Sequence, residues 1–229
     1  GVTHVFGIVS IHNMPIFDAI TRDGTIQIID CRHEMGATHA ADGYARATGK
    51  TGIAIASTGP GTTNTVTGLY EAQYASSPVL LITGQAETGF YGKAQGYVHE
   101  AEEQLPMLRT VTRRAESVRI ASRIEDTILE VANDISSGRP SSGAVEIPID
   151  LQYAEVSESG HGFNPVNPAM TGDLEHAVSL ITGSRKRIII AGGGVTYGGA
   201  SDALTRLAEK LQAPVFMTPN GRKIPYSDT

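Results

Sequence analysis

The chain has 229 residues, which is enough for one or two domains with a buried core. Its net charge of −6 gives no support for binding to nucleic acid or to an anionic membrane. A single cysteine, Cys31, excludes an internal disulfide and a metal site of several cysteines, and it is typical of a reducing cytoplasm. No apolar run approaches the roughly 18 residues of a membrane span. There is no signal-peptide pattern, and the missing initiator Met predicts a fragment of a longer protein.

The first 153 residues alternate between short apolar runs and helical patterns, the order typical of a parallel, doubly wound α/β sheet flanked by helices. The apolar runs predict strands at Val2–Ile8, Thr25–Asp30, Gly52–Ser57, Pro78–Thr83 and Gly143–Ile149. The helical patterns predict helices at Met14–Ile20, from Glu34 onward, and at Thr62–Ala75, Leu105–Val111 and Ile124–Ile135. The polar segment 84–103, rich in Gly and Tyr, predicts an exposed loop or lid.

A second, Rossmann-like α/β domain begins after a linker. Residues 154–168 have linker composition, and residues 169–229 form the start of the second domain. Its predicted elements are a helix at Asp173–Ile181, a strand at Arg187–Ala191, a helix at Ala200–Leu211 and a strand at Pro214–Thr218. Two strands do not enclose a domain core, so we expect this domain to be partial.

An acidic side chain, Glu34, stands where the strand Thr25–Asp30 ends and a helix begins. Ligands of open α/β sheets bind at this edge, which makes Glu34 a candidate functional residue. The alternative is a solvated acid that interacts favourably with the helix dipole. His33 and His39 are six residues apart, about 240° around a helix with ~100° per residue, so they do not form a zinc site.

Two glycine-rich turns follow predicted strands. The turn that contains Gly59 and Gly61 lets backbone approach a ligand, although it lacks the ending of a nucleotide P-loop. A tight turn without a ligand is the alternative. The second turn, Gly192, Gly193 and Gly194, resembles a dinucleotide-binding turn, and close helix–strand packing explains it equally well.

Three further side chains have reactive chemistry. Cys31 at a strand end is more often a buried, inert thiol than a nucleophile. His12 and His99 lie alone in predicted loops, where a histidine is more often a surface residue than a catalyst. No Gly-x-Ser-x-Gly motif is present, which argues against an α/β-hydrolase.

Four motifs taken together resemble the thiamine-diphosphate enzymes of the acetolactate (acetohydroxyacid) synthase group. They are Arg32-His33-Glu34 running to Gly43–Gly49, Thr58–Asn64, Leu81–Gln85, and Gly138–Pro140 leading into Glu146–Asp150. By this resemblance, residues 1–153 are the domain that binds the cofactor's pyrimidine ring, and residues 169–229 begin the central domain. It implies a transferase or lyase that makes or breaks C–C bonds of 2-keto acids.

The resemblance gives Glu34 a catalytic role. A glutamate bonded to a pyrimidine nitrogen favours the imino form of that ring, which takes the thiazolium proton, and the cofactor then acts as ylid and electron sink. An apolar pocket that raises the carboxyl pKa would keep it protonated near neutral pH. The expected cofactor-binding residues are Ile8, Glu34, Gly59, Pro60, Gly61, Asn64 and Glu100. The expected substrate pocket consists of His12, His99 and Glu100.

Departures from the family pattern bear on the substrate. The synthases usually have Phe-Gly-x-Pro-Gly-Gly after the first strand, where this chain has Phe6–His12. His12 lies where the similar benzaldehyde lyase has an active-site histidine, and Glu100 replaces a glutamine of these enzymes, which changes charge and donor capacity. The open alternatives are cleavage of 2-hydroxyacyl-CoA or oxalyl-CoA, a benzoin-type lyase, and a non-catalytic paralogue.

The family binds diphosphate and Mg²⁺ through a Gly-Asp-Gly motif in a separate C-terminal domain, and this motif does not occur in the sequence. The resemblance therefore implies that the chain alone is inactive and holds no metal. It also implies that a second subunit of a homodimer or homotetramer completes the active site. FAD in the central domain, near Gly192, Gly193 and Gly194, is a further cofactor compatible with the family.

Overall fold

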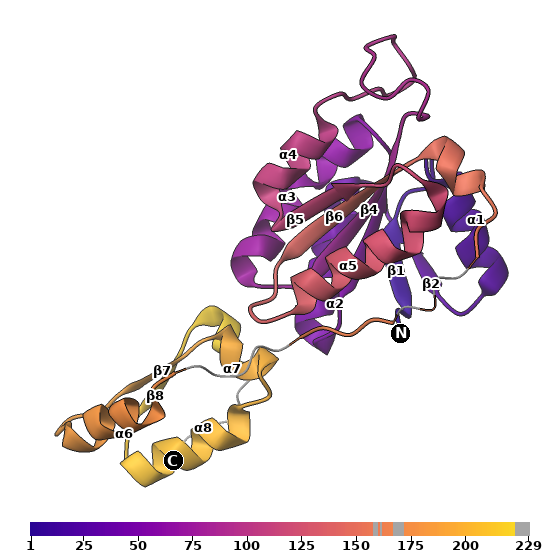
Figure 1. Ribbon diagram of the computed structural model, residues 1–229. Coiled ribbons are helices and arrows are strands. Elements are labelled where there is room, and N and C mark those ends of the chain that lie inside the picture. The colour runs from indigo at the N-terminus through magenta and orange to yellow at the C-terminus, as the bar shows by residue number, and fades with distance from the viewer. Residues whose placement is uncertain (158–159, 161, 167–171, 223–229) are drawn as a thin grey trace. The chain divides into compact units, whose positions relative to one another are not determined.

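The computed structural model describes residues 1–157, 160, 162–166 and 172–222 (Figure 1). The chain divides into two compact units, residues 1–167 and 168–229, and each is described by itself. The predicted end of the linker at residue 168 and the start of the second domain at residue 169 lie outside the described residues. Both boundaries therefore stay predictions. Within the linker, Asn164 and Val166 donate backbone N–H bonds to Asn133 Oδ1 and Ser137 Oγ of the first unit.

The first unit is built on six parallel strands in the order β2-β1-β3-β4-β6-β5. They are β1 (His4–Gly7), β2 (Gln27–Asp30), β3 (Gly52–Ala56), β4 (Val79–Gln85), β5 (Arg114–Ser117) and β6 (Ser142–Pro148). The central strands β3, β4 and β6 are buried along almost their whole length, which explains why their sequences are mostly apolar. The predicted parallel α/β fold is confirmed.

Helices cover both faces of this sheet (Figure 1). They are α1 (Met14–Asp23), α2 (Glu34–Thr48), α3 (Pro60–Ala75), α4 (Gln104–Val111) and α5 (Ile124–Ser136). Helices α2, α3 and α4 pack on one face, in a core that contains Leu69 and Leu81. Helices α1 and α5 pack on the other face, with Ile135 and Leu80. Leu80 and Leu81 enter different cores because successive strand residues point to opposite faces.

The strand order places a switch point between β1 and β3. Strand β1 lies between β2 and β3, so the chain leaves β1 in one direction across the sheet and later returns on its other side. Ligands of open α/β sheets bind at the carboxyl ends of the strands beside such a point. The loops that leave this edge are 8–13, 31–33, 57–59 and 86–103, and they contain five of the nine site residues predicted in this unit.

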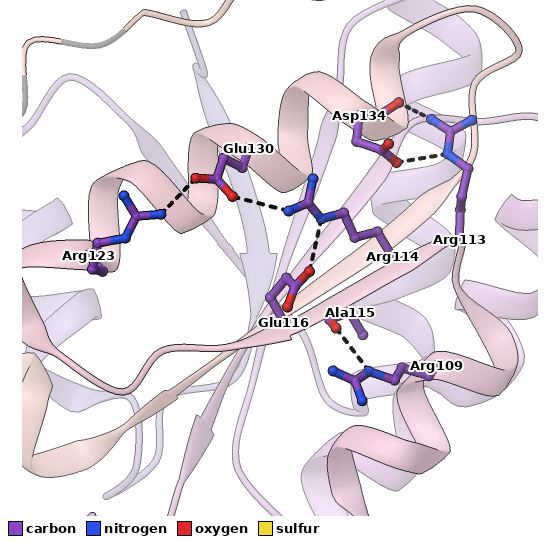
Figure 2. Close-up of polar contacts among 8 residues, drawn as sticks. All are labelled: Arg109, Arg113, Arg114, Ala115, Glu116, Arg123, Glu130 and Asp134. Atoms are coloured by element: carbon purple, nitrogen blue, oxygen red, sulfur yellow. Dashed lines mark hydrogen bonds and ion pairs between the residues drawn. The ribbon is translucent and has the colours of Figure 1, made fainter.

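Strand β5 was not predicted from the sequence. It pairs with β6 at the edge of the sheet and buries only Ala115, so it lacks an apolar pattern. Charged side chains join this edge to α5 instead (Figure 2). Arg114 lies 3.1 Å from Glu130, and Arg113, one residue before the strand, lies 2.9 Å from Asp134.

Strand β4 is longer than predicted. Gly84 and Gln85 continue its pairing with β6, opposite Ile147 and Pro148. The two residues are buried, so the loop that follows begins at residue 86 and the prediction that it begins at Gly84 was wrong.

Over residues 172–222, the second unit contains a parallel pair of strands with three α-helices. They are α6 (Leu174–Gly183), β7 (Ile189–Ala191), α7 (Gly193–Tyr197), α8 (Ser201–Leu211) and β8 (Val215–Met217). The short helix α7 occupies the glycine-rich stretch where only a turn was predicted. Short 3-10 segments lie at Ala121–Arg123, Ile149–Tyr153 and Pro219–Gly221. Among the residues described in both units, none of the helices has the length and apolar character needed to cross a membrane.

Candidate active site

Glu34 is the first residue of α2, at the carboxyl-terminal edge of the sheet. Its Oε2 accepts a hydrogen bond from Asn64 Nδ2 of α3 at 3.0 Å. His33 precedes the helix and caps it, because its Nδ1 accepts the N–H of Met35 at 3.1 Å. His33 therefore has a local structural role. Among the described residues, no cluster of His, Cys, Asp or Glu could hold a metal.

The turn before α3 brings backbone against Glu34. A Cβ added to Gly61 would lie 2.8 Å from Ser57 Cβ and 3.3 Å from Glu34 Oε1. Gly59 has a φ of 59°, and its added Cβ would lie 2.5 Å from the carbonyl oxygen of His99. Pro60 starts the helix, where its missing N–H costs nothing. A side chain at either position would collide with neighbouring atoms, so both positions require glycine.

His12 lies in the loop that follows β1, and its side chain is buried. It is only 1% exposed, so the alternative that it is a surface residue was wrong. Its Nδ1 lies 3.4 Å from Ser57 Oγ, and its Nε2 has no hydrogen-bond partner among the described residues. Burial, and secondarily the nearby His99, lower the pKa of His12, so its ring is neutral at pH 7.

Ile8 directly follows β1 and begins the same loop. Its carbonyl accepts Asn13 Nδ2 at 3.1 Å, and Asn13 Oδ1 accepts the N–H of Ser10 at 2.7 Å. The buried side chain of Asn13 therefore closes the loop that carries His12.

The segment 86–103 folds over the Gly59 turn. The rings of His99 and His12 lie 5.5 Å apart, so two histidines that are solitary in the sequence are paired in space. Glu100 accepts the N–H of Tyr97 through Oε2 at 3.0 Å, while its buried Oε1 has no partner among the described residues. Gly59, Tyr97, His99 and Glu100 all line a cavity of about 760 Å³.

The first unit thus gathers six of the predicted site residues into two groups. In the first group, Gly61 and Asn64 contact the carboxylate of Glu34. In the second group, His99 and Glu100 belong to the segment 86–103, and the ring of His12 lies next to that of His99. Ser57 connects the two groups, since it contacts His12 and lies next to Gly61.

The predicted glycines Gly192, Gly193 and Gly194 belong to the second unit. Gly192 precedes α7, and an added Cβ on Gly193 would lie 3.1 Å from Asn220 Cβ. Close packing inside the unit therefore accounts for Gly193.

Sequence reasoning missed two buried polar residues next to the site. Gln104, the first residue of α4, accepts the N–H of Gly59 through Oε1 at 2.8 Å. Its Nε2 donates to Glu146 Oε2 at 3.0 Å. The sequence did contain a signal for Glu146, because it is an acid within an otherwise mostly apolar strand. The contact between Gly59 and Gln104 joins residues 45 positions apart and has no local signature.

Cys31 follows the end of β2 and is partly buried. Its Sγ lies 3.6 Å from the carbonyl oxygen of Ile29. Burial raises the pKa of the Cys31 thiol, which disfavours the reactive thiolate and supports an inert role.

Comparisons with known proteins match both units. The family description "Thiamine pyrophosphate enzyme, N-terminal TPP binding domain" matches residues 1–107, and "Thiamine pyrophosphate enzyme, central domain" matches residues 174–228. Thiamine pyrophosphate is another name for thiamine diphosphate. The two matches together cover most of the chain and confirm the resemblance drawn from its motifs.

Longer relatives agree with this family. An acetolactate synthase of Arthrospira platensis is 35% identical, over 97% of this chain and 40% of that protein. The acetolactate synthase large subunit of Lactococcus lactis is 33% identical, over 95% of this chain and 38% of that protein. A glyoxylate carboligase of Escherichia coli O157:H7 is 33% identical, over 96% of this chain and 38% of that protein. The chain spans about 40% of the length of these relatives, and it belongs to the thiamine pyrophosphate enzymes, of which it carries N-terminal and central-domain sequence.

Proposed function

We propose that this chain carries the pyrimidine-activating half of the active site of a thiamine-diphosphate-dependent carboligase or lyase. The reaction would make or break C–C bonds of 2-keto acids, as in an acetolactate synthase. The observation that carries the proposal is the Glu34 carboxylate, bonded to Asn64 at 3.0 Å and placed beside a glycine-lined turn at the switch point of the sheet.

The residues at this edge suit an aminopyrimidine ring. Gly61 lets the backbone of the turn lie close to Ser57 and to Glu34 Oε1, and Glu34 and Asn64 offer a carboxyl and an amide. Thiamine diphosphate, when bound, supplies a nucleophilic carbon and an electron sink. Glu34 would hold a proton at a ring nitrogen, and Asn64 would hold the carboxyl in position through Oε2. Ile8, Gly59 and Pro60 would complete this side of the cofactor pocket.

We assign the substrate side to His12, His99 and Glu100. His12 Nε2 and Glu100 Oε1 are buried polar atoms without a partner among the described residues, as expected for groups that meet a ligand. The neutral ring of His12 can donate or accept a proton at Nε2. The similarity to an acetolactate synthase and a glyoxylate carboligase supports carboligation over the CoA-cleavage alternative.

The proposal extends to the complete enzyme. Diphosphate and Mg²⁺ would bind to a further domain of a second subunit, so the enzyme would be a homodimer or homotetramer, in a reducing cytoplasm. FAD would bind in the central domain near Gly192, Gly193 and Gly194. Flavin absorbance in the purified enzyme, together with its mass in solution, tests these two points.

Turnover of pyruvate by the complete enzyme, with saturating thiamine diphosphate and Mg²⁺, tests the function. Glu34→Gln keeps the size of the side chain but removes the acid, and we expect kcat to fall by about 100-fold or more. Glu209→Gln, on the exposed side of α8, is the matched control and should keep wild-type activity. A Glu34→Gln enzyme with wild-type turnover would refute the role of Glu34. Absence of cofactor binding to the wild type in calorimetry would favour a non-catalytic paralogue.

A further inference from the structure

We propose that Gln104 and Glu146 form a buried clamp that positions the Gly59 turn, and through it Glu34, for activation of the cofactor. This inference rests on the function proposed above. Neither side chain needs to touch the cofactor, so Gln104 is a positioning residue.

The side-chain amide of Gln104 makes all the hydrogen bonds that it can make. The side chain is 2% exposed, and its Oε1 accepts both the N–H of Gly59 at 2.8 Å and the hydroxyl of Thr58 at 3.0 Å. Its Nε2 donates to the carbonyl of Gly84 at 3.0 Å and to Glu146 Oε2 at 3.0 Å. Two acceptor positions and two donor positions satisfy the whole capacity of an amide side chain.

These partners permit one orientation of the Gln104 amide. The N–H of Gly59 can only donate, and the carbonyl of Gly84 can only accept. A flipped amide would place two donors against each other on one side and two acceptors against each other on the other side. Burial makes such unpaired groups costly, so the Gly59 peptide is held at a fixed position.

Glu146 holds both ends of the segment 86–103. It is 0% exposed on β6 and accepts from Gln85 Nε2 at 3.3 Å, just before the segment, and from Gln104 Nε2, just after it. Its other oxygen accepts the hydroxyl of Tyr91, within the segment, at 2.5 Å. One carboxylate therefore connects the segment that carries His99 to the turn that carries Gly59.

The clamp reaches Glu34 through the start of α3. The carbonyl of Gly59 accepts the N–H of Thr63 at 2.9 Å, so the Gly59 peptide sets the direction in which the helix begins. Gly61 and Asn64 lie within the first five residues of α3, and both face Glu34. A rotation of the Gly59 peptide would therefore displace the only side chain that is bonded to the Glu34 carboxylate among the described residues.

Hydrogen–deuterium exchange at the reactive carbon of bound thiamine diphosphate tests the clamp in the complete enzyme. The assay runs well below the melting temperature of each variant, so that a loss of stability alone leaves the rate unchanged. Gln104→Leu should slow exchange by about tenfold or more, because it leaves the N–H of Gly59 unpaired. Gln95→Leu, at an exposed glutamine of the same segment, should exchange at the wild-type rate.

A polarity swap separates positioning from packing. Gln104→Glu keeps the shape but places a second carboxylate against Glu146, and it should also slow exchange. Adding Glu146→Gln restores a donor opposite residue 104, and the double variant should exchange roughly threefold faster than Gln104→Glu alone. These isosteric variants decide the matter if Gln104→Leu fails to fold.

Wild-type exchange in a folded Gln104→Leu variant, or no recovery in the double variant, would overturn this inference and leave the proposed function intact. A wild-type enzyme that does not bind thiamine diphosphate would overturn the proposed function, and this inference with it.

Discussion

Asn64 Nδ2 lies 3.0 Å from Glu34 Oε2, and this hydrogen bond joins the N-terminal ends of α2 and α3. The two residues are 30 positions apart, and each helix begins directly after a strand of the same sheet. The bond orients a carboxyl group at the edge where α/β sheets bind ligands. It is the geometric basis of the proposed function.

The close contact of α2 with α3 depends on a glycine. A Cβ added to Gly68 would lie 2.2 Å from Thr38 Oγ1, a hydroxyl that donates to the carbonyl of Glu34. We expect Gly68→Ala to lower the free energy of unfolding by ~1–3 kcal/mol through overpacking. Gly43→Ala is the control, since its added Cβ meets open space on α2 and should stabilise the helix by up to ~1 kcal/mol. Urea denaturation measures both effects, and equal changes in the two variants would contradict the structure.

Stability should depend on pH through His12. Because burial and His99 lower the pKa of His12, the folded state binds its proton less readily than the unfolded state does. Above the ordinary histidine pKa of about 6.5, the ring is neutral in both states and does not lower the stability. As the pH falls below that value, the unfolded state takes up the proton first, and the free energy of unfolding decreases by at most ~1.4 kcal/mol per pH unit. His12→Gln should flatten the curve of unfolding free energy against pH between about pH 7.5 and 5.5. Parallel curves for the wild type and the variant would contradict this assignment.

Most of the first unit was predictable from the sequence because its central strands are buried on both faces and its helices begin or end at recognisable residues. Strand β5 was not predictable, because Arg114–Ser117 have no apolar pattern and form a strand through their pairing with β6. The pairing of His12 with His99 and the bond from Gln104 to Gly59 are tertiary contacts between distant residues. No local propensity or motif spacing contains that information.

The charged edge at β5 should contribute little to stability. Glu130 binds Arg114 at 3.1 Å and Arg123 at 2.7 Å, but all three side chains are at least one-third exposed to solvent (Figure 2). We expect Glu130→Gln to lower the free energy of unfolding by about 0.2–1 kcal/mol in low salt. The difference from the wild type should shrink in 1 M NaCl, about an order of magnitude above physiological salt, because salt screens exposed charges. A loss above about 2 kcal/mol would mean that the network is far less solvated than the structure shows.

Cys31 should react slowly with thiol reagents. Burial raises the pKa of its thiol, so only a small fraction is thiolate at neutral pH. The rate of alkylation by iodoacetamide, followed by mass spectrometry, should keep rising with pH beyond the ordinary cysteine pKa of about 8.5. A rate that levels off below that pH would identify an activated thiol and contradict the inert role.

Hydrogen–deuterium exchange at the reactive carbon of bound thiamine diphosphate tests the role of Glu34 most directly, because it isolates activation of the cofactor from every later step. The complete enzyme is compared with Glu34→Gln and with the control Glu209→Gln, all saturated with thiamine diphosphate and Mg²⁺. We predict that exchange in Glu34→Gln is slower by about 100-fold or more, while the control matches the wild type. Wild-type exchange in a Glu34→Gln enzyme that still binds the cofactor would contradict the proposed function of this site.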